Sequence, residues 1–129
     1  MLATLPAPRT RATRPTGGGW RYSAPWCSRR VSAVTPGCIQ ISGGTINRVE
    51  PRGPWINILD PGFNLHVRED HIAAAWQVDK PTVDGTVTAV ELYDAAGELF
   101  LIMVGVRETG VPELPEWRAL VHALPGVTG

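Results

Sequence analysis

Two basic residues, Lys80 and Arg107, are the clearest ligand-binding candidates in the sequence. Lys80 is the chain's only lysine and precedes Pro81 at the end of a predicted strand, and Arg107 follows the last predicted strand. Two consecutive antiparallel hairpins return the chain to the same end of a sheet, which predicts both cations at one rim. Cations beside an apolar sheet suit a ligand with a large apolar body and carboxylates. The alternative is that both are ordinary solvated rim charges.

The histidines and cysteines form no recognisable metal or catalytic motif. His66, His71 and His122 lie in different predicted elements, without the spacing of a zinc site. On its predicted strand, His66 is expected to be a hydrogen-bonded structural residue, and the other two histidines are expected to be solvated. Cys27 and Cys38 fit no disulfide framework, and Cys38 lies in an apolar run that predicts a buried free thiol. Phosphate-binding, dinucleotide-binding and nucleophile-elbow motifs are also missing from the sequence.

The charge distribution predicts an N-terminal tail followed by one domain. Residues 1–49 contain seven arginines and no acidic residue, whereas the rest of the chain has twelve acids against five basic residues. Residues 1–36 contain five prolines and a run of three glycines and are expected to be a disordered or non-native extension, with the domain at residues 37–129. Aromatic residues interleaved with arginines there could stack on single-stranded nucleic acid, but the extension is the favoured interpretation and no nucleic-acid partner is expected.

Hydrophobic periodicity predicts an α+β fold, an antiparallel meander with one C-terminal helix. Asp60-Pro61-Gly62 is typical of a tight turn, and Ser42-Gly43-Gly44 is predicted to end the first strand in another. A helix is expected from Pro115 until Pro125-Gly126. The strands are predicted at residues 38–41, 46–50, 55–59, 63–68, 72–78, 86–93 and 98–106.

The sequence also predicts where the protein resides. No run of about eighteen apolar residues is present, so no transmembrane helix is expected. The N-terminus lacks the apolar segment of a secretory signal, and its prolines oppose the amphipathic helix of a transit peptide. A cytoplasmic protein without a membrane partner is therefore expected.

Five segments of the chain carry a family resemblance: Gly37-Cys-Ile-Gln-Ile41, Gly53-Pro-Trp-Ile-Asn-Ile-Leu-Asp-Pro-Gly-Phe-Asn-Leu-His-Val-Arg-Glu-Asp70, Trp76-Gln-Val-Asp-Lys-Pro-Thr82, Asp84-Gly85 and Pro112-Glu-Leu-Pro-Glu-Trp-Arg118. They resemble the C-terminal half of bacterial hemin-degrading factors, the cytoplasmic HemS/ChuS/PhuS-type heme proteins. The resemblance covers residues 37–124. It implies a large antiparallel sheet, one half of a HemS-like fold, with heme against it. It also implies that Lys80 and Arg107 contact the heme propionates.

Departures from the family pattern limit what the resemblance implies. Arg107-Glu-Thr-Gly110 replaces the family's Arg-Lys-Pro-Gly, which costs one positive charge. The family's axial histidine belongs to a helical segment N-terminal to this repeat and has no counterpart here, so a truncated half-domain is expected. His66 is a substitute axial ligand only if its side chain faces the heme pocket.

Three functions from different classes therefore stay open. Heme binding or trafficking in heme-iron utilisation is preferred, with heme as cofactor. Heme degradation additionally needs iron coordination and an electron donor, and whether the chain is an enzyme stays open. The third hypothesis is a non-catalytic half-domain that forms a homodimer and no longer binds heme.

Overall fold

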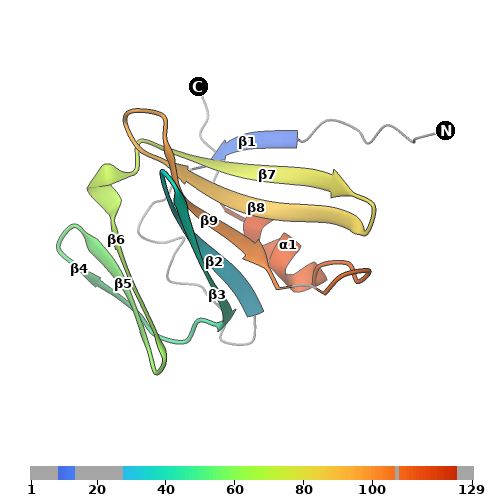
Figure 1. Cartoon of the computed structure of the whole chain (residues 1–129), viewed down its shortest axis with the longest axis horizontal. Coiled ribbons are helices and arrows are strands. Elements are labelled where there is room, and N and C mark those ends of the chain that lie inside the picture. Colours follow the sequence, from blue (N-terminus) through green and yellow to red (C-terminus); the bar gives the residue numbers. More distant parts are fainter. Residues whose placement is uncertain (1–8, 14–27, 107, 125–129) are drawn as a thin grey trace.

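The computed structural model describes residues 9–13, 28–106 and 108–124, which form two antiparallel sheets and one α-helix (Figure 1). The six-stranded sheet has the order β1-β7-β8-β9-β2-β3, and the three-stranded sheet has the order β4-β5-β6. The predicted class, mostly antiparallel sheet with one C-terminal helix, is confirmed. The elements are β1 (Arg9–Thr13), β2 (Ser28–Thr35), β3 (Cys38–Thr45), β4 (Val49–Arg52), β5 (Trp55–Asp60), β6 (Phe63–Arg68), the 3-10 turn η1 (Glu69–His71), β7 (Ala74–Thr82), β8 (Gly85–Tyr93), β9 (Leu99–Gly105) and α1 (Pro115–His122).

The prediction of a single meander needs correction, because β5 and β6 belong to the smaller sheet. Their hairpin closes at Asp60↔Phe63, and Gly62 has the positive φ of 84° that its turn requires. The local prediction of this hairpin is confirmed. Its neighbour, however, is β4 rather than any strand of the larger sheet. Turn residues determine a hairpin locally, whereas the choice of sheet depends on distant packing.

The domain boundary expected at residue 36 also needs correction for the described residues. β2 lies between β9 and β3, with Val31 paired to both Met103 and Ser42. Val31 is 3% exposed, so it belongs to the core. β1 likewise pairs along β7, from Arg9↔Asp79 to Thr13↔Ala75. Proline and glycine content dominated the sequence-based prediction, but β1 pairs with β7 and β2 with β9, and both of these partners lie far along the chain.

Three local predictions in or beside β3 were wrong. Gly43 and Gly44 do not form a turn, since β3 continues to Thr45 opposite Ser28, and the return strand expected at residues 46–50 is instead β4, which begins at Val49. Cys38 is exposed rather than buried, because β3 is an edge strand.

One hydrophobic core joins both sheets and α1. The covered face of the six-stranded sheet, which we call the inner face, packs against both α1 and the three-stranded sheet; its opposite is the outer face (Figure 1). Complete burial of one aliphatic side chain contributes about 1.5–3 kcal/mol. The core side chains are Val31, Ile46, Ile58, Ala75, Val90, Leu92, Leu101, Met103, Trp117 and Val121.

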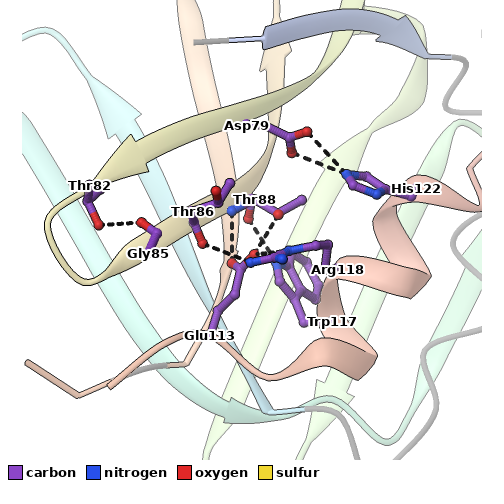
Figure 2. A network of polar contacts seen from close by, with 9 residues as sticks. All are labelled: Asp79, Thr82, Gly85, Thr86, Thr88, Glu113, Trp117, Arg118 and His122. Carbon is purple, nitrogen blue, oxygen red and sulfur yellow. Dashed lines mark hydrogen bonds and ion pairs between the residues drawn. The ribbon is translucent and has the colours of Figure 1, made fainter. Parts of the chain in front are cut away.

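A polar network anchors α1 to β8 (Figure 2). Trp117 Nε1 donates to the Thr88 carbonyl at 2.8 Å. The fully buried Glu113 carboxylate accepts from Thr88 N at 2.8 Å and from Arg118 Nε at 3.1 Å. His122, at the end of the helix, lies 3.2 Å from an Asp79 carboxylate oxygen. In the described part of the chain, no helix is long and apolar enough to cross a membrane.

Candidate functional site

Lys80 lies on the outer face of the six-stranded sheet. Strand alternation places it on the same side as Trp76 and Val78, while the intervening Gln77 donates to the carbonyl of Leu124, beyond α1 on the inner side. Lys80 lies within β7, opposite Val87, and not at the end of the strand as predicted.

An ion pair with Glu91 holds Lys80 across the sheet. Lys80 Nζ donates to Glu91 Oε1 at 2.6 Å. The Val78↔Ala89 pair lies between Lys80↔Val87 and Trp76↔Glu91 in the strand register, so the ion pair extends over it. This explains why Ala89 is 0% exposed on the face that α1 leaves uncovered. The Lys80 side chain is 43% exposed, whereas that of Glu91 is only 10% exposed.

Tyr93 completes the cluster by binding the second carboxylate oxygen. Its hydroxyl donates to Glu91 Oε2 at 2.6 Å. Burial alone raises the pKa of Glu91, but the hydrogen bonds from Lys80 and Tyr93, together with the Lys80 charge, outweigh burial and leave the pKa below its usual value. The hydrogen bond to the Glu91 carboxylate, followed by burial and carboxylate charge, raises the pKa of Tyr93 to about 12. We call Lys80, Glu91 and Tyr93 the outer-face cluster.

The outer-face cluster borders an apolar surface. Glu91 and Tyr93 line a cleft of about 440 Å³ together with Trp76 and Val78, and Lys80 lies outside the lining of this cleft. Farther across the same face, Ile102 of β9 and Ile41 of β3 are apolar, with the polar Ser32 of β2 between them in the strand register. Ile41 is 63% exposed. The outer face therefore combines a cation with apolar strands.

Arg107, the second predicted cation, lies outside the described residues. The described end of β9 is nevertheless informative, because Val104 pairs with Ala89 and Gly105 follows it. β9 thus ends at the same end of the sheet as the Lys80↔Val87 pair.

The structure does not bring His66 together with Lys80. Leu65 and Val67 of β6 pack on the core, so the intervening His66 is on the outward side of the small sheet, opposite Asn57. Its Nδ1 lies 2.7 Å from Asn57 Oδ1. His66 and Lys80 therefore lie on outward faces of two different sheets, with the core between them.

Asn57 determines which nitrogen of the neutral His66 ring carries the proton. Asn57 Nδ2 donates to the Glu50 carbonyl at 3.0 Å, which orients the amide so that Oδ1 faces the imidazole. Nδ1 of the neutral ring must then donate, and Nε2 carries the lone pair. Among the described residues, no group of three or more His, Cys, Asp or Glu side chains could hold a metal ion.

The family model for the haemin-degrading HemS.ChuX domain matches residues 29–124 of the chain. The chain belongs to this HemS/ChuX family. Hemin transport protein HmuS of Yersinia pestis is 42% identical over 88 residues, which cover 68% of this chain and 26% of that protein. Hemin transport protein HemS of Yersinia enterocolitica is 44% identical over 82 residues, or 64% of this chain and 24% of that protein. The HemS/ChuX-family chain thus spans about a quarter of these curated relatives.

Solved structures of the HemS/ChuX family have the same fold. The chain is similar to holo-PhuS, a heme-binding protein from Pseudomonas aeruginosa, with a TM-score of 0.86 and 32% identity over 92% of this chain and 35% of that one. It is also similar to the heme degrading enzyme ChuS of Escherichia coli O157:H7, with a TM-score of 0.83 and 33% identity over 90% of this chain and 36% of that one. ChuX, at 14% identity and a TM-score of 0.73, shows the fold alone.

Residue types alone did not single out two members of the outer-face cluster of this HemS/ChuX domain, Glu91 and Tyr93. A signal for them does exist. The Asp84-Gly85 hairpin sets the register Thr82↔Gly85, and counting along both strands from that pair places Lys80 and Glu91 on one face. The pairing of their side chains additionally requires the tertiary structure.

Proposed function

We propose that this domain binds heme on the outer face of its six-stranded sheet and serves heme trafficking in cytoplasmic iron utilisation. The observation that carries the proposal is Lys80 Nζ at the border of an apolar sheet surface, in a chain of the HemS/ChuX family. Heme is a flat apolar macrocycle with two carboxylates, and it needs both an apolar platform and cations.

The residues of the outer face fit this ligand. Lys80 has three N–H donors, of which Glu91 Oε1 takes one, and its side chain is 43% exposed. A second donor can therefore meet a propionate oxygen. We propose Arg107 as the other propionate partner, on the strength of its place after β9 and the family resemblance. Bound heme would supply the iron chemistry, while these residues orient the macrocycle.

Hemin titration of the full chain tests the proposal. A saturable Soret shift is expected, and Lys80→Ala should weaken affinity roughly tenfold, because a hydrogen bond to a charged group contributes about 1.5–3 kcal/mol. Arg48→Ala is the matched control, since Arg48 is an exposed cation paired with Glu50 at 3.0 Å on the small sheet. A titration without a saturable shift would refute heme binding. Equal affinity for Lys80→Ala and the wild type would exclude Lys80 as a propionate partner.

We propose His66 separately, as the ligand of a heme that binds the small sheet. The oriented ring with its Nε2 lone pair supports this proposal, whereas a heme held by Lys80 lies on another face. A His66→Ala variant should lose the spectral signature of imidazole ligation and keep the Lys80-dependent shift. An unchanged spectrum would eliminate His66 as a ligand.

The alternative function is a dimerising domain that does not bind heme. Ile39 and Ile41 favour it, because both are more than 60% exposed on the edge strand β3. Light scattering would show a dimer that Ile41→Glu converts to a monomer, with no hemin-induced shift. Heme turnover is tested independently, by loss of heme absorbance with a reductant while catalase removes peroxide.

A further inference from the structure

We propose that Glu91 competes with the carboxylate of the ligand for Lys80. The outer face would thereby discriminate between ligands with free carboxylates and ligands whose carboxylates are esterified. In the ligand-free protein Glu91 accepts a hydrogen bond from Lys80. An incoming carboxylate must share Lys80 with Glu91 or replace Glu91 as the partner of Lys80. This inference rests on the proposed function, since it concerns the same surface and the same lysine.

The geometry shows which partner of the ion pair stays in place. Glu91 uses both oxygens, Oε1 toward Lys80 Nζ and Oε2 toward the Tyr93 hydroxyl, each at 2.6 Å. Its side chain is 10% exposed, while that of Lys80 is 43% exposed. A lysine has three donors on a flexible stem, whereas this carboxylate has two separate hydrogen-bond anchors. Lys80 is therefore the partner that can turn toward a ligand, and Glu91 remains beside it.

The charge balance then determines the effect on binding. Lys80 and Glu91 together are neutral, so an anionic ligand meets one attractive and one repulsive charge at nearly the same point. The Glu91 carboxylate is only 10% exposed, although Lys80 is 43% exposed, so the Glu91 charge is screened less than a charge in bulk water. Removal of the Glu91 charge should thus strengthen binding of a carboxylate. The same change should leave an esterified ligand unaffected.

Affinity measurements on full-length variants test this inference. Glu91→Gln removes the charge and keeps an oxygen that can accept from Tyr93. We expect it to bind hemin about tenfold more tightly than the wild type and to bind hemin dimethyl ester with unchanged affinity. Glu50→Gln is the matched control, because Glu50 also pairs with basic side chains, at 3.0 Å and 2.8 Å, but on the small sheet. Its hemin affinity should not change.

The outcomes separate the two proposals. Equal hemin affinity of Glu91→Gln and the wild type, or an equal gain for the ester, would overturn the competitor role while heme binding stands. If the Glu91→Gln variant binds hemin and the wild type does not, Glu91 competes strongly with the ligand for Lys80. Failure of both proteins to bind hemin would overturn the proposed function as well.

The single lysine provides a second measurement that does not depend on any variant. Because Lys80 is the only lysine of the chain, its side-chain ¹⁵N resonance is unique in a lysine-labelled sample. Saturation with diamagnetic gallium protoporphyrin should shift this resonance, and the dimethyl ester should shift it much less. A resonance unmoved by the free acid at saturation would refute carboxylate exchange at Lys80.

Discussion

The indole ring of Trp117 lies directly against Gly105, so that a Cβ on this glycine would lie 2.7 Å from Trp117 Cδ1. Gly105 ends β9 and Trp117 is 2% exposed in the first half of α1. The contact holds the helix close to the end of the strand that leads to Arg107. Backbone conformation plays no part in this requirement, since the φ of Gly105 is not positive.

Gly105→Ala should therefore destabilise the domain by about 1–3 kcal/mol, the usual cost of adding a methyl group to a packed core. Urea unfolding monitored by circular dichroism measures the change. Gly43→Ala is the control, because its Cβ would only meet Arg30 Cγ at an ordinary 3.6 Å. Equal stability of the two variants would mean that Trp117 moves aside without cost.

Loss of the Glu113 carboxylate should loosen α1. Glu113→Ala removes the acceptor of Thr88 N and Arg118 Nε from a buried site. An unsatisfied buried donor such as Thr88 N costs about 1–3 kcal/mol, whereas the Arg118 side chain is 41% exposed and can bind water instead. We expect a lower urea midpoint and faster amide exchange in α1, with Glu108→Ala, a substitution at an exposed loop position, as the control. An unchanged midpoint would show that water replaces the carboxylate.

The Tyr93 phenol should lose its proton at a higher pH than an ordinary tyrosine. Its pKa is raised to about 12, so the phenolate should appear well above pH 10 in a Tyr22→Phe variant, where Tyr93 is the only tyrosine. A raised folded-state pKa contributes stability that is complete below the unfolded value near 10 and is lost as pH rises through 12. Ultraviolet absorbance titration with parallel circular dichroism measures both. Adding Glu91→Gln should lower the midpoint, and an unchanged midpoint would contradict the hydrogen bond.

Glu91 should make the domain sensitive to acid. Its folded-state pKa lies below the usual value of 4.5, so its contribution to stability is present above that pH and is lost as pH falls through the lowered pKa. Chemical denaturation between pH 7 and pH 3 should show a shallower acid loss for Glu91→Gln than for the wild type. Parallel curves for the two proteins would argue against the ion pair with Lys80.

The His66 tautomer should depend on Asn57. In neutral His66 the proton is expected on Nδ1, because Asn57 Oδ1 accepts at 2.7 Å. Imidazole ¹⁵N chemical shifts report the tautomer directly, and Asn57→Ala should move the proton toward Nε2, the form that exposed histidines usually favour. His71, exposed in η1, provides an internal reference. An Nε2 proton in the wild type would reverse the assignment of the lone pair.

The local elements of this protein follow from short stretches of its sequence. Backbone preferences and the polar–apolar pattern of neighbouring residues account for four of these elements. They are the strand Phe63–Arg68, the turn at Gly62, the Asp84-Gly85 hairpin and the helix that begins at Pro115. The motifs around them were also enough to identify the family, because framework residues in fixed order are characteristic of a fold.

Which elements become neighbours depends on tertiary packing, and the structure was needed to show it. It put Ser28–Thr35 between β9 and β3, moved Trp55–Asp60 into a second sheet and exposed Cys38 on an edge strand. It also paired Lys80 with Glu91 and turned His66 away from both. The pairing of Ser28–Thr35 with β9 and the packing of both sheets on one core involve residues far along the chain, and a local pattern contains no information about these contacts.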